Sequence, residues 1–96
     1  MKIIKDNAEL MNLIKGDAII KFSAEGCGPC KMMTKILEEI ESETGKTFYE
    51  CDMAVVDDQS RFHIMSVPTV IKYQNGEETE RITGLNTKPA IKEFLR

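Results

Sequence analysis

The sequence predicts an α/β protein in which helices flank a central mixed β-sheet. Short β-prone runs alternate with amphipathic stretches through the first half of the 96 residues, which is typical of parallel strands joined by crossover helices. In the second half, Asn75-Gly76 separates two further β-prone runs and predicts a tight antiparallel hairpin. The expected order of elements is therefore βαβαβαββα.

The first two strands and the helix between them are marked by clear start and stop residues. Residues 2–5 form a short β-prone piece, and Asp6 or Asn7 can cap the helix that follows. Apolar residues recur in this helix at helical spacing until Gly16 ends it. The second strand is expected over residues 18–23.

The second helix has the strongest periodicity in the chain. Over residues 31–43, apolar side chains recur at i, i+3, i+4 and i+7, with charged residues on the remaining faces. The apolar stripe consists of Met33, Ile36, Leu37 and Ile40. This helix is expected to end near Thr44-Gly45, because glycine commonly follows the last helical turn.

The remaining elements are shorter. A third strand is expected over 46–52 and a short helix over 57–64. The hairpin strands are expected over 69–74 and 78–83. The last helix, over 87–95, carries a proline in its first turn, where the missing N–H costs nothing.

Length and charge exclude several classes of protein. A chain of 96 residues predicts a single domain, residues 1–96, with one core. A net charge of −3 with acids and bases interleaved gives no basic stripe for nucleic acid. The first residues lack the apolar run of a signal peptide, and no stretch approaches the length of a membrane span. We therefore expect a cytoplasmic, monomeric protein with neither nucleic acid nor membrane as a partner.

The motif Cys27-Gly28-Pro29-Cys30 points to redox chemistry. It lies between the strand over 18–23 and the long helix, so the two thiols fall in a strand-to-helix turn. Unpaired backbone N–H groups and the positive end of the helix dipole favour a thiolate at such a position. Two thiols at this spacing can close and reopen a disulfide without unfolding the chain, and they need no cofactor or metal to do so.

Metal binding and plain burial are the alternative explanations for the three cysteines. A zinc site would need two ligands besides Cys27 and Cys30, and Cys51 and His63 are the only further sulfur or nitrogen candidates. These two residues are separated in the expected fold, so zinc is disfavoured. Cys51 is expected to fill the core as a small apolar residue.

Four features occur together in this sequence. They are the CGPC motif after a strand, Val67-Pro68-Thr69 before another strand, the Asn-Gly hairpin, and Gly84 beyond the hairpin. With these features the chain resembles the thioredoxin family over essentially its whole length. The resemblance implies the thioredoxin fold and a thiol-disulfide oxidoreductase, an electron carrier that reduces protein disulfides. It also implies a separate thioredoxin reductase as electron donor.

The resemblance assigns roles residue by residue. Cys27 is the exposed attacking thiol and Cys30 the more buried resolving thiol, with Pro68 in the cis form facing them. Gly28, Pro29, Pro68 and Lys21 are expected to support the active site. Gly26, Ser66, Val67 and Gly84 are expected to line a shallow substrate groove beside Cys27. An extended segment of a partner protein can pair there with the backbone of Val67 as an added strand.

Several positions depart from the family pattern. Thioredoxins commonly keep a buried Asp as proton acceptor for the resolving cysteine, and the matching residue here is Lys21. A cationic Lys21 near the pair favours thiolates, so we expect a more oxidising disulfide than in relatives with the acid. Gly26 and Ser23 replace two aromatic residues, and the chain contains no Trp.

Two other functions remain open from the sequence. The first is a glutaredoxin-like oxidoreductase reduced by glutathione, which the loss of aromatics at Gly26 and Ser23 slightly favours. Gly28-Pro29 between the cysteines favours the thioredoxin type instead. The second is a non-catalytic subunit that uses the same fold to bind a partner protein, against which the intact CGPC motif counts.

Overall fold

The computed structural model describes residues 1–96 and contains one five-stranded mixed sheet. The strands are β1 (Lys2–Ile3), β2 (Ala18–Ser23), β3 (Tyr49–Asp52), β4 (Thr69–Gln74) and β5 (Glu77–Thr83). The helices are α1 (Asn7–Leu13), α2 (Gly28–Thr44) and α3 (Lys88–Phe94). The strand order is β1-β3-β2-β4-β5. Strand β3 runs parallel to β1 and β2, while β4 runs antiparallel to β2 and β5, which confirms the predicted mixed sheet.

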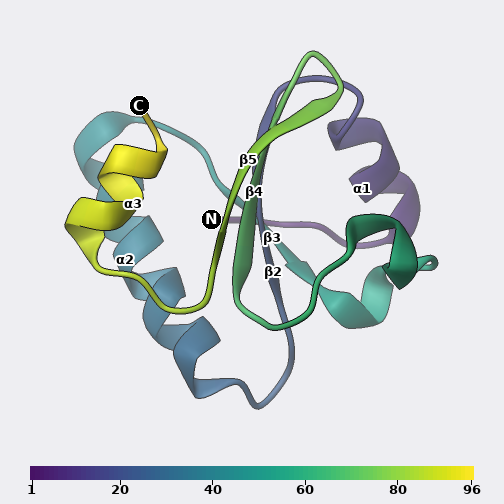
Figure 1. The fold of residues 1–96 in the computed structure, drawn as a ribbon, viewed down its shortest axis with the longest axis horizontal. Coiled ribbons are helices and arrows are strands. Elements are labelled where there is room, and N and C mark those ends of the chain that lie inside the picture. The colour runs from purple at the N-terminus through teal and green to yellow at the C-terminus, as the bar shows by residue number, and fades with distance from the viewer.

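Helices cover both faces of the sheet. Figure 1 shows α2 and α3 on one side of the strands and α1 on the other. The period of two along each strand sends alternate side chains to the two layers. In β2, Ile20 and Phe22 join the cluster packed under α1, whereas Ile19 packs against the cluster under α2 and α3. By the same alternation Lys21 faces α2, where its ammonium group reaches Thr34.

Side chains and glycines define the helix ends as expected. The Asp6 carboxylate accepts a hydrogen bond from the backbone N–H of Glu9 at 2.9 Å and so caps α1. Helix α2 ends at Gly45, whose φ of 75° lies in the left-handed region. In the hairpin, Asn75 and Gly76 both adopt positive φ, at 54° and 82°, as a tight primed turn requires.

The predicted helix over residues 57–64 is wrong. The chain forms two 3₁₀ turns instead, η1 (Met53–Val55) and η2 (Gln59–Phe62). The Asp52 carboxylate accepts from the N–H of Ala54 at 2.9 Å, so the first turn begins directly after β3. His63 takes a left-handed conformation with φ 51° and ends the second turn before an α-helix can form.

Two strands are shorter than the sequence predicts. The third begins at Tyr49 and not at residue 46, because the preceding backbone bonds to side chains of α2. The N–H of Lys46 donates to Thr44, and the N–H of Phe48 donates to Glu41. The first strand ends at Ile3. None of the helices combines the length and the apolar composition that crossing a membrane requires.

Candidate active site

Cys27 and Cys30 are joined by a disulfide at the N-terminus of α2, with their Cα atoms 5.2 Å apart. Gly26, with φ 77°, turns the chain between the end of β2 and the helix. Cys27 is the N-cap residue, and Gly28 and Pro29 follow it in the first turn. The strand-to-helix turn predicted for the motif is therefore present.

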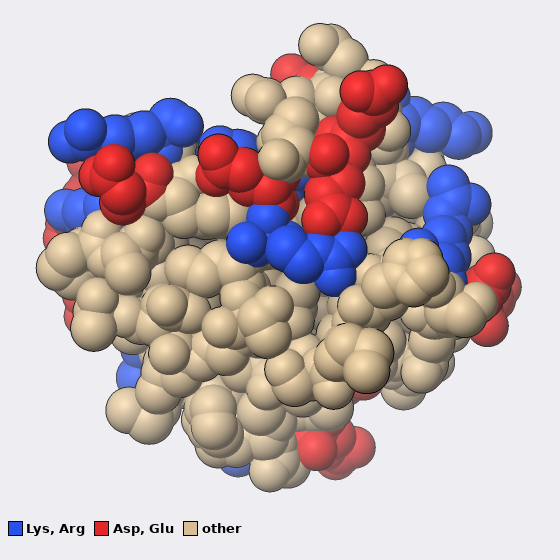
Figure 2. All heavy atoms as spheres, viewed as in Figure 1, with Lys and Arg blue, Asp and Glu red and all other residues tan.

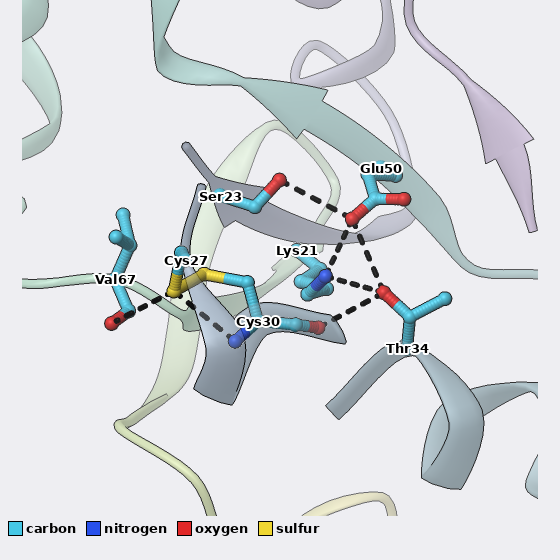
Figure 3. A network of polar contacts seen from close by, with 7 residues as sticks. All are labelled: Lys21, Ser23, Cys27, Cys30, Thr34, Glu50 and Val67. Carbon is cyan, nitrogen blue, oxygen red and sulfur yellow. Dashed lines mark hydrogen bonds and ion pairs between the residues drawn. A yellow bond between two sulfur atoms is a disulfide. The ribbon is translucent and has the colours of Figure 1, made fainter. Parts of the chain in front are cut away.

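The two sulfur atoms have different environments. The side chain of Cys30 is buried, with 3% of its surface exposed, whereas Cys27 is half-buried. The backbone N–H of Cys30 donates to Cys27 Sγ at 3.1 Å (Figure 3). A donor N–H and the positive end of a 17-residue helix both stabilise negative charge, so in the reduced protein they favour a thiolate at Cys27.

The segment around Pro68 lies beside this pair. The Val67-Pro68 peptide bond is cis, as the resemblance implies. The carbonyl oxygen of Val67 lies 3.9 Å from Cys27 Sγ, and Figure 3 shows it pointing toward the sulfur. Pro68 is buried, and its carbonyl oxygen accepts from the N–H of Gly84 at 2.7 Å. The structure thus brings the backbone of residues 67, 68 and 84 together at the active-site surface.

Gly26 lines a groove of about 510 Å³ on the α2 side of the cysteines. Ser66, Val67 and Gly84 are not among the residues that line this groove. Ser66 is exposed, and its carbonyl oxygen accepts from Thr69 Oγ1 at 2.8 Å. The shallow substrate groove expected beside Cys27 stays a prediction.

A buried ion pair forms the floor of the α2-side groove. Lys21 Nζ donates to Glu50 Oε1 and to Thr34 Oγ1, each at 2.5 Å. Ser23 Oγ donates to the same Glu50 oxygen at 3.2 Å. Figure 3 shows the four side chains converging behind the disulfide, and both cysteines line the same groove. Only 1% of Lys21 is exposed, against 22% of Glu50.

Sequence reasoning missed Glu50 and Thr34. Lys21 and Glu50 occupy facing positions of the parallel strands β2 and β3, so the two charges meet only once the register is known. A signal was nevertheless available. A Lys inside a buried strand needs a counter-charge, and the next expected strand offers two acidic residues on one face, Glu50 and Asp52.

A thioredoxin family model matches residues 3–96. The chain belongs to the thioredoxin family. It is 34% identical over the full length of both chains to a thioredoxin of Mycoplasmoides gallisepticum. It is 31% identical to a thioredoxin of Bacillus subtilis, with 99% of this chain and 96% of the relative covered. A solved structure of Plasmodium falciparum thioredoxin superposes with a TM-score of 0.86 at 31% identity, covering 99% of this chain and 96% of that one.

Family membership and the paired cysteines together support thioredoxin-type disulfide reduction by a thiol-disulfide oxidoreductase. Nothing in the site or in these matches favours the glutathione-dependent or the non-catalytic alternative. Lys21 is not an isolated cation behind the cysteines. Glu50 compensates Lys21, so the pair brings no net charge to the groove, and the stated reason for a more oxidising disulfide no longer holds.

Cys51 is confirmed as a core residue. It is completely buried in the cluster under α1, and burial, with a smaller contribution from the Asp52 carboxylate, raises the pKa of its thiol to about 12. His63 is exposed at the end of η2. No group of three or more His, Cys, Asp and Glu side chains is arranged to hold a metal ion.

Proposed function

We propose that Cys27 attacks disulfides of target proteins and that Cys30 resolves the resulting mixed disulfide. The observation that carries this assignment is the contrast between the two sulfur atoms. Cys27 is partly exposed and accepts a hydrogen bond from the N–H of Cys30, while Cys30 is 3% exposed and lies in the first turn of α2. A bulky partner can reach Cys27 first, and only an intramolecular reaction brings in Cys30.

The reaction balances in two exchanges. The Cys27 thiolate attacks one sulfur of the target disulfide, and the other target sulfur leaves as a thiolate that takes up a proton. Cys30 then loses its proton and attacks Cys27 Sγ, which releases the second target sulfur. Two electrons pass to the target, and the Cys27–Cys30 disulfide forms. Proximity drives the second step, since effective concentrations in well-oriented intramolecular reactions reach about 10⁵ M or more.

The surface beside Val67 suits an extended segment of a target protein. Figure 2 shows that the lower half of this face is almost free of charge, over the start of α2 and the loops before β4 and after β5. Met65 and Leu85, in those two loops, are 93% and 43% exposed. We place the backbone of Val67, with Ser66 and Gly84, at the centre of this surface, where a target strand would add to it.

A thioredoxin reductase is the proposed electron donor, and the cytoplasm the proposed compartment, with the protein acting as a monomer. A bifunctional thioredoxin reductase/thioredoxin of Mycobacterium leprae is 38% identical over an alignment of 76 residues, which covers 76% of this chain and 17% of the fusion. The fusion links the two activities in that relative. A reducing compartment keeps a dithiol ready to attack, which favours the cytoplasm.

A coupled assay tests the assignment. The chain is mixed with a disulfide-bonded protein substrate, with thioredoxin reductase and NADPH in one arm and glutathione in the other. We expect turnover in the reductase arm, its loss in Cys27→Ser and in Cys30→Ser, and its retention in Cys51→Ala. Turnover with glutathione alone would instead support a glutaredoxin-like enzyme, and full activity of the double Cys27→Ser, Cys30→Ser variant would contradict dithiol chemistry.

A further inference from the structure

We propose that Thr34 is a positioning residue that couples the resolving cysteine to the buried Lys21–Glu50 pair. Thr34 lies one helical turn after Cys30, and its hydroxyl donates to the carbonyl oxygen of Cys30 at 3.0 Å. The inference rests on the proposed role of Cys30 and adds a residue that holds Cys30 in place.

The hydrogen-bond geometry leaves the hydroxyl few choices. Lys21 has no lone pair to offer and can only donate, so its contact at 2.5 Å occupies a lone pair of Thr34 Oγ1. The single hydroxyl proton of Thr34 then goes to Cys30 at 3.0 Å or to Glu50 at 3.3 Å. The shorter distance favours the carbonyl of Cys30. The result is a continuous series of hydrogen bonds from the Lys21 ammonium to the Thr34 hydroxyl to the Cys30 carbonyl.

The Lys21–Glu50 pair, at the start of this series of hydrogen bonds, is held in place by the sheet. Lys21 is 1% exposed and sits on β2, and Glu50 sits in register beside it on β3. Separation of the two charges would leave the buried Lys21 ammonium without its counter-charge, which is costly. Thr34 therefore ties the first turn of α2 to two strands of the central sheet (Figure 3).

This tie matters most when the disulfide is open. The first turn of α2 contains Pro29, which lacks an N–H, and in the oxidised protein the Cys27–Cys30 bond itself holds the turn. Once that bond is reduced, the Thr34 contact still fixes the carbonyl of Cys30. Attack on the mixed disulfide then requires only a side-chain rotation, which keeps the effective concentration of Cys30 high.

The test separates the two exchanges. Reduced protein is mixed in stopped flow with an equimolar amount of dithiobis(nitrobenzoate), a chromogenic disulfide. Attack by Cys27 releases one nitrothiobenzoate anion, and attack by Cys30 on Cys27 Sγ releases the second. The rate of the second release reports resolution, and the equilibrium of the closed disulfide against a reference dithiol is measured separately.

Thr34→Val should leave the release of the first anion unchanged and slow the release of the second roughly fivefold, since one hydrogen bond of ordinary net strength corresponds to about that factor. The protein disulfide should also become easier to reduce by roughly the same factor, because a less well-held Cys30 closes the ring less favourably. Thr34→Ser retains the hydroxyl and should restore both values. Thr34→Ala, with high helix propensity, provides a second variant without the hydroxyl should the valine disturb folding.

Thr44→Val is the matched control. Thr44 makes the same type of bond at the other end of α2, donating to the carbonyl of Ile40 at 2.6 Å, but it has no contact with an ion pair. It should resolve the mixed disulfide as the wild type does. The proposal would be overturned if both Thr34→Val and Thr34→Ala kept the wild-type rates and equilibria. It would also be overturned if Thr34→Ser released the second anion as slowly as Thr34→Val does. A wild type that releases a single anion would instead overturn the role of Cys30 itself.

Discussion

Lys21 and Glu50 face each other in register across β2 and β3, and Lys21 Nζ lies 2.5 Å from Glu50 Oε1. The two partners are not equally buried. Lys21 is almost completely removed from water, whereas about a fifth of the Glu50 side chain remains exposed to the groove. Glu50 also accepts from Ser23 at 3.2 Å. Loss of one partner is therefore expected to have different consequences from loss of the other.

Glu50→Gln should destabilise the protein more than Lys21→Met does. The first change leaves a buried cation without its counter-charge, for which we expect a cost of about 3 kcal/mol in the free energy of unfolding. The second leaves a carboxylate that water and Ser23 can still solvate, and we expect a cost of about 1 kcal/mol. Urea unfolding measures both. Glu93→Gln, in a solvent-exposed pair with Arg96, should change little. Equal costs, or the reverse order, would contradict the burial argument.

The ion pairs between α2 and α3 make stability depend on pH at the acid end. Hydrogen bonds from Lys88, and then from Lys92, lower the pKa of Glu43 from 4.5 to about 2. Because the folded pKa is depressed, this contribution is fully present above pH 4.5 and is lost as the pH falls toward 2.

Wild type should therefore exceed Glu43→Gln in stability above pH 4.5, and the difference should vanish near pH 2. Melting temperatures measured across this range check it, and added salt should reduce the difference, since these side chains are exposed. Glu38→Gln on the same helix, where the residue forms no ion pair, is the control. A difference that persists unchanged at the acid end would show that the pairing contributes nothing.

Gly76→Ala should destabilise the hairpin more than Gly45→Ala destabilises the end of α2. Both glycines have positive φ, at 82° and 75°, so each alanine pays a left-handed penalty of about 1 kcal/mol. A Cβ on Gly76 would additionally lie 3.0 Å from the carbonyl oxygen of Lys15, whereas one on Gly45 meets nothing within 4 Å. We expect the first variant to cost about 1 kcal/mol more in thermal or urea unfolding. Identical costs would show that the Lys15 backbone yields freely.

Cys51 should remain unreactive while the protein is folded. Burial raises the pKa of its thiol to about 12, so almost no thiolate exists at neutral pH. Brief treatment of the reduced protein with an alkylating agent should label Cys27 first and leave Cys51 unmodified, as read by peptide mass spectrometry. Addition of denaturant should expose Cys51 to the reagent. Label on Cys51 under native conditions would mean that the core under α1 opens readily.

Much of the fold follows from local signals in the sequence. Asp6 caps a helix because its side chain can accept a backbone N–H, and Gly45 ends one because it tolerates positive φ. Asn75-Gly76 fixes the hairpin for the same reason. The CGPC turn follows from a strand signal next to a helix signal, and it placed both cysteines correctly at the start of α2.

Other features depend on contacts between distant segments. The Lys21–Glu50 pair requires the register of β2 against β3, and the role of Thr34 requires the side of α2 that faces them. The groove on the α2 side of the cysteines, which Gly26 lines together with Lys21 and Glu50, also depends on how these segments pack in three dimensions. The expected helix over 57–64 does not form, because Asp58 makes no capping hydrogen bond at the start of η2 and His63 adopts a left-handed conformation that ends it.

The central claim is that Cys27 attacks and Cys30 releases the target, and Cys30→Ser tests it most directly. The reduced variant is incubated with a disulfide-bonded protein substrate and analysed by non-reducing electrophoresis and mass spectrometry, with Cys27→Ser as the matched control. We predict that Cys30→Ser accumulates a covalent complex joined through Cys27, while Cys27→Ser and the wild type accumulate none. A complex that forms through another cysteine, or no complex in Cys30→Ser, would contradict the account.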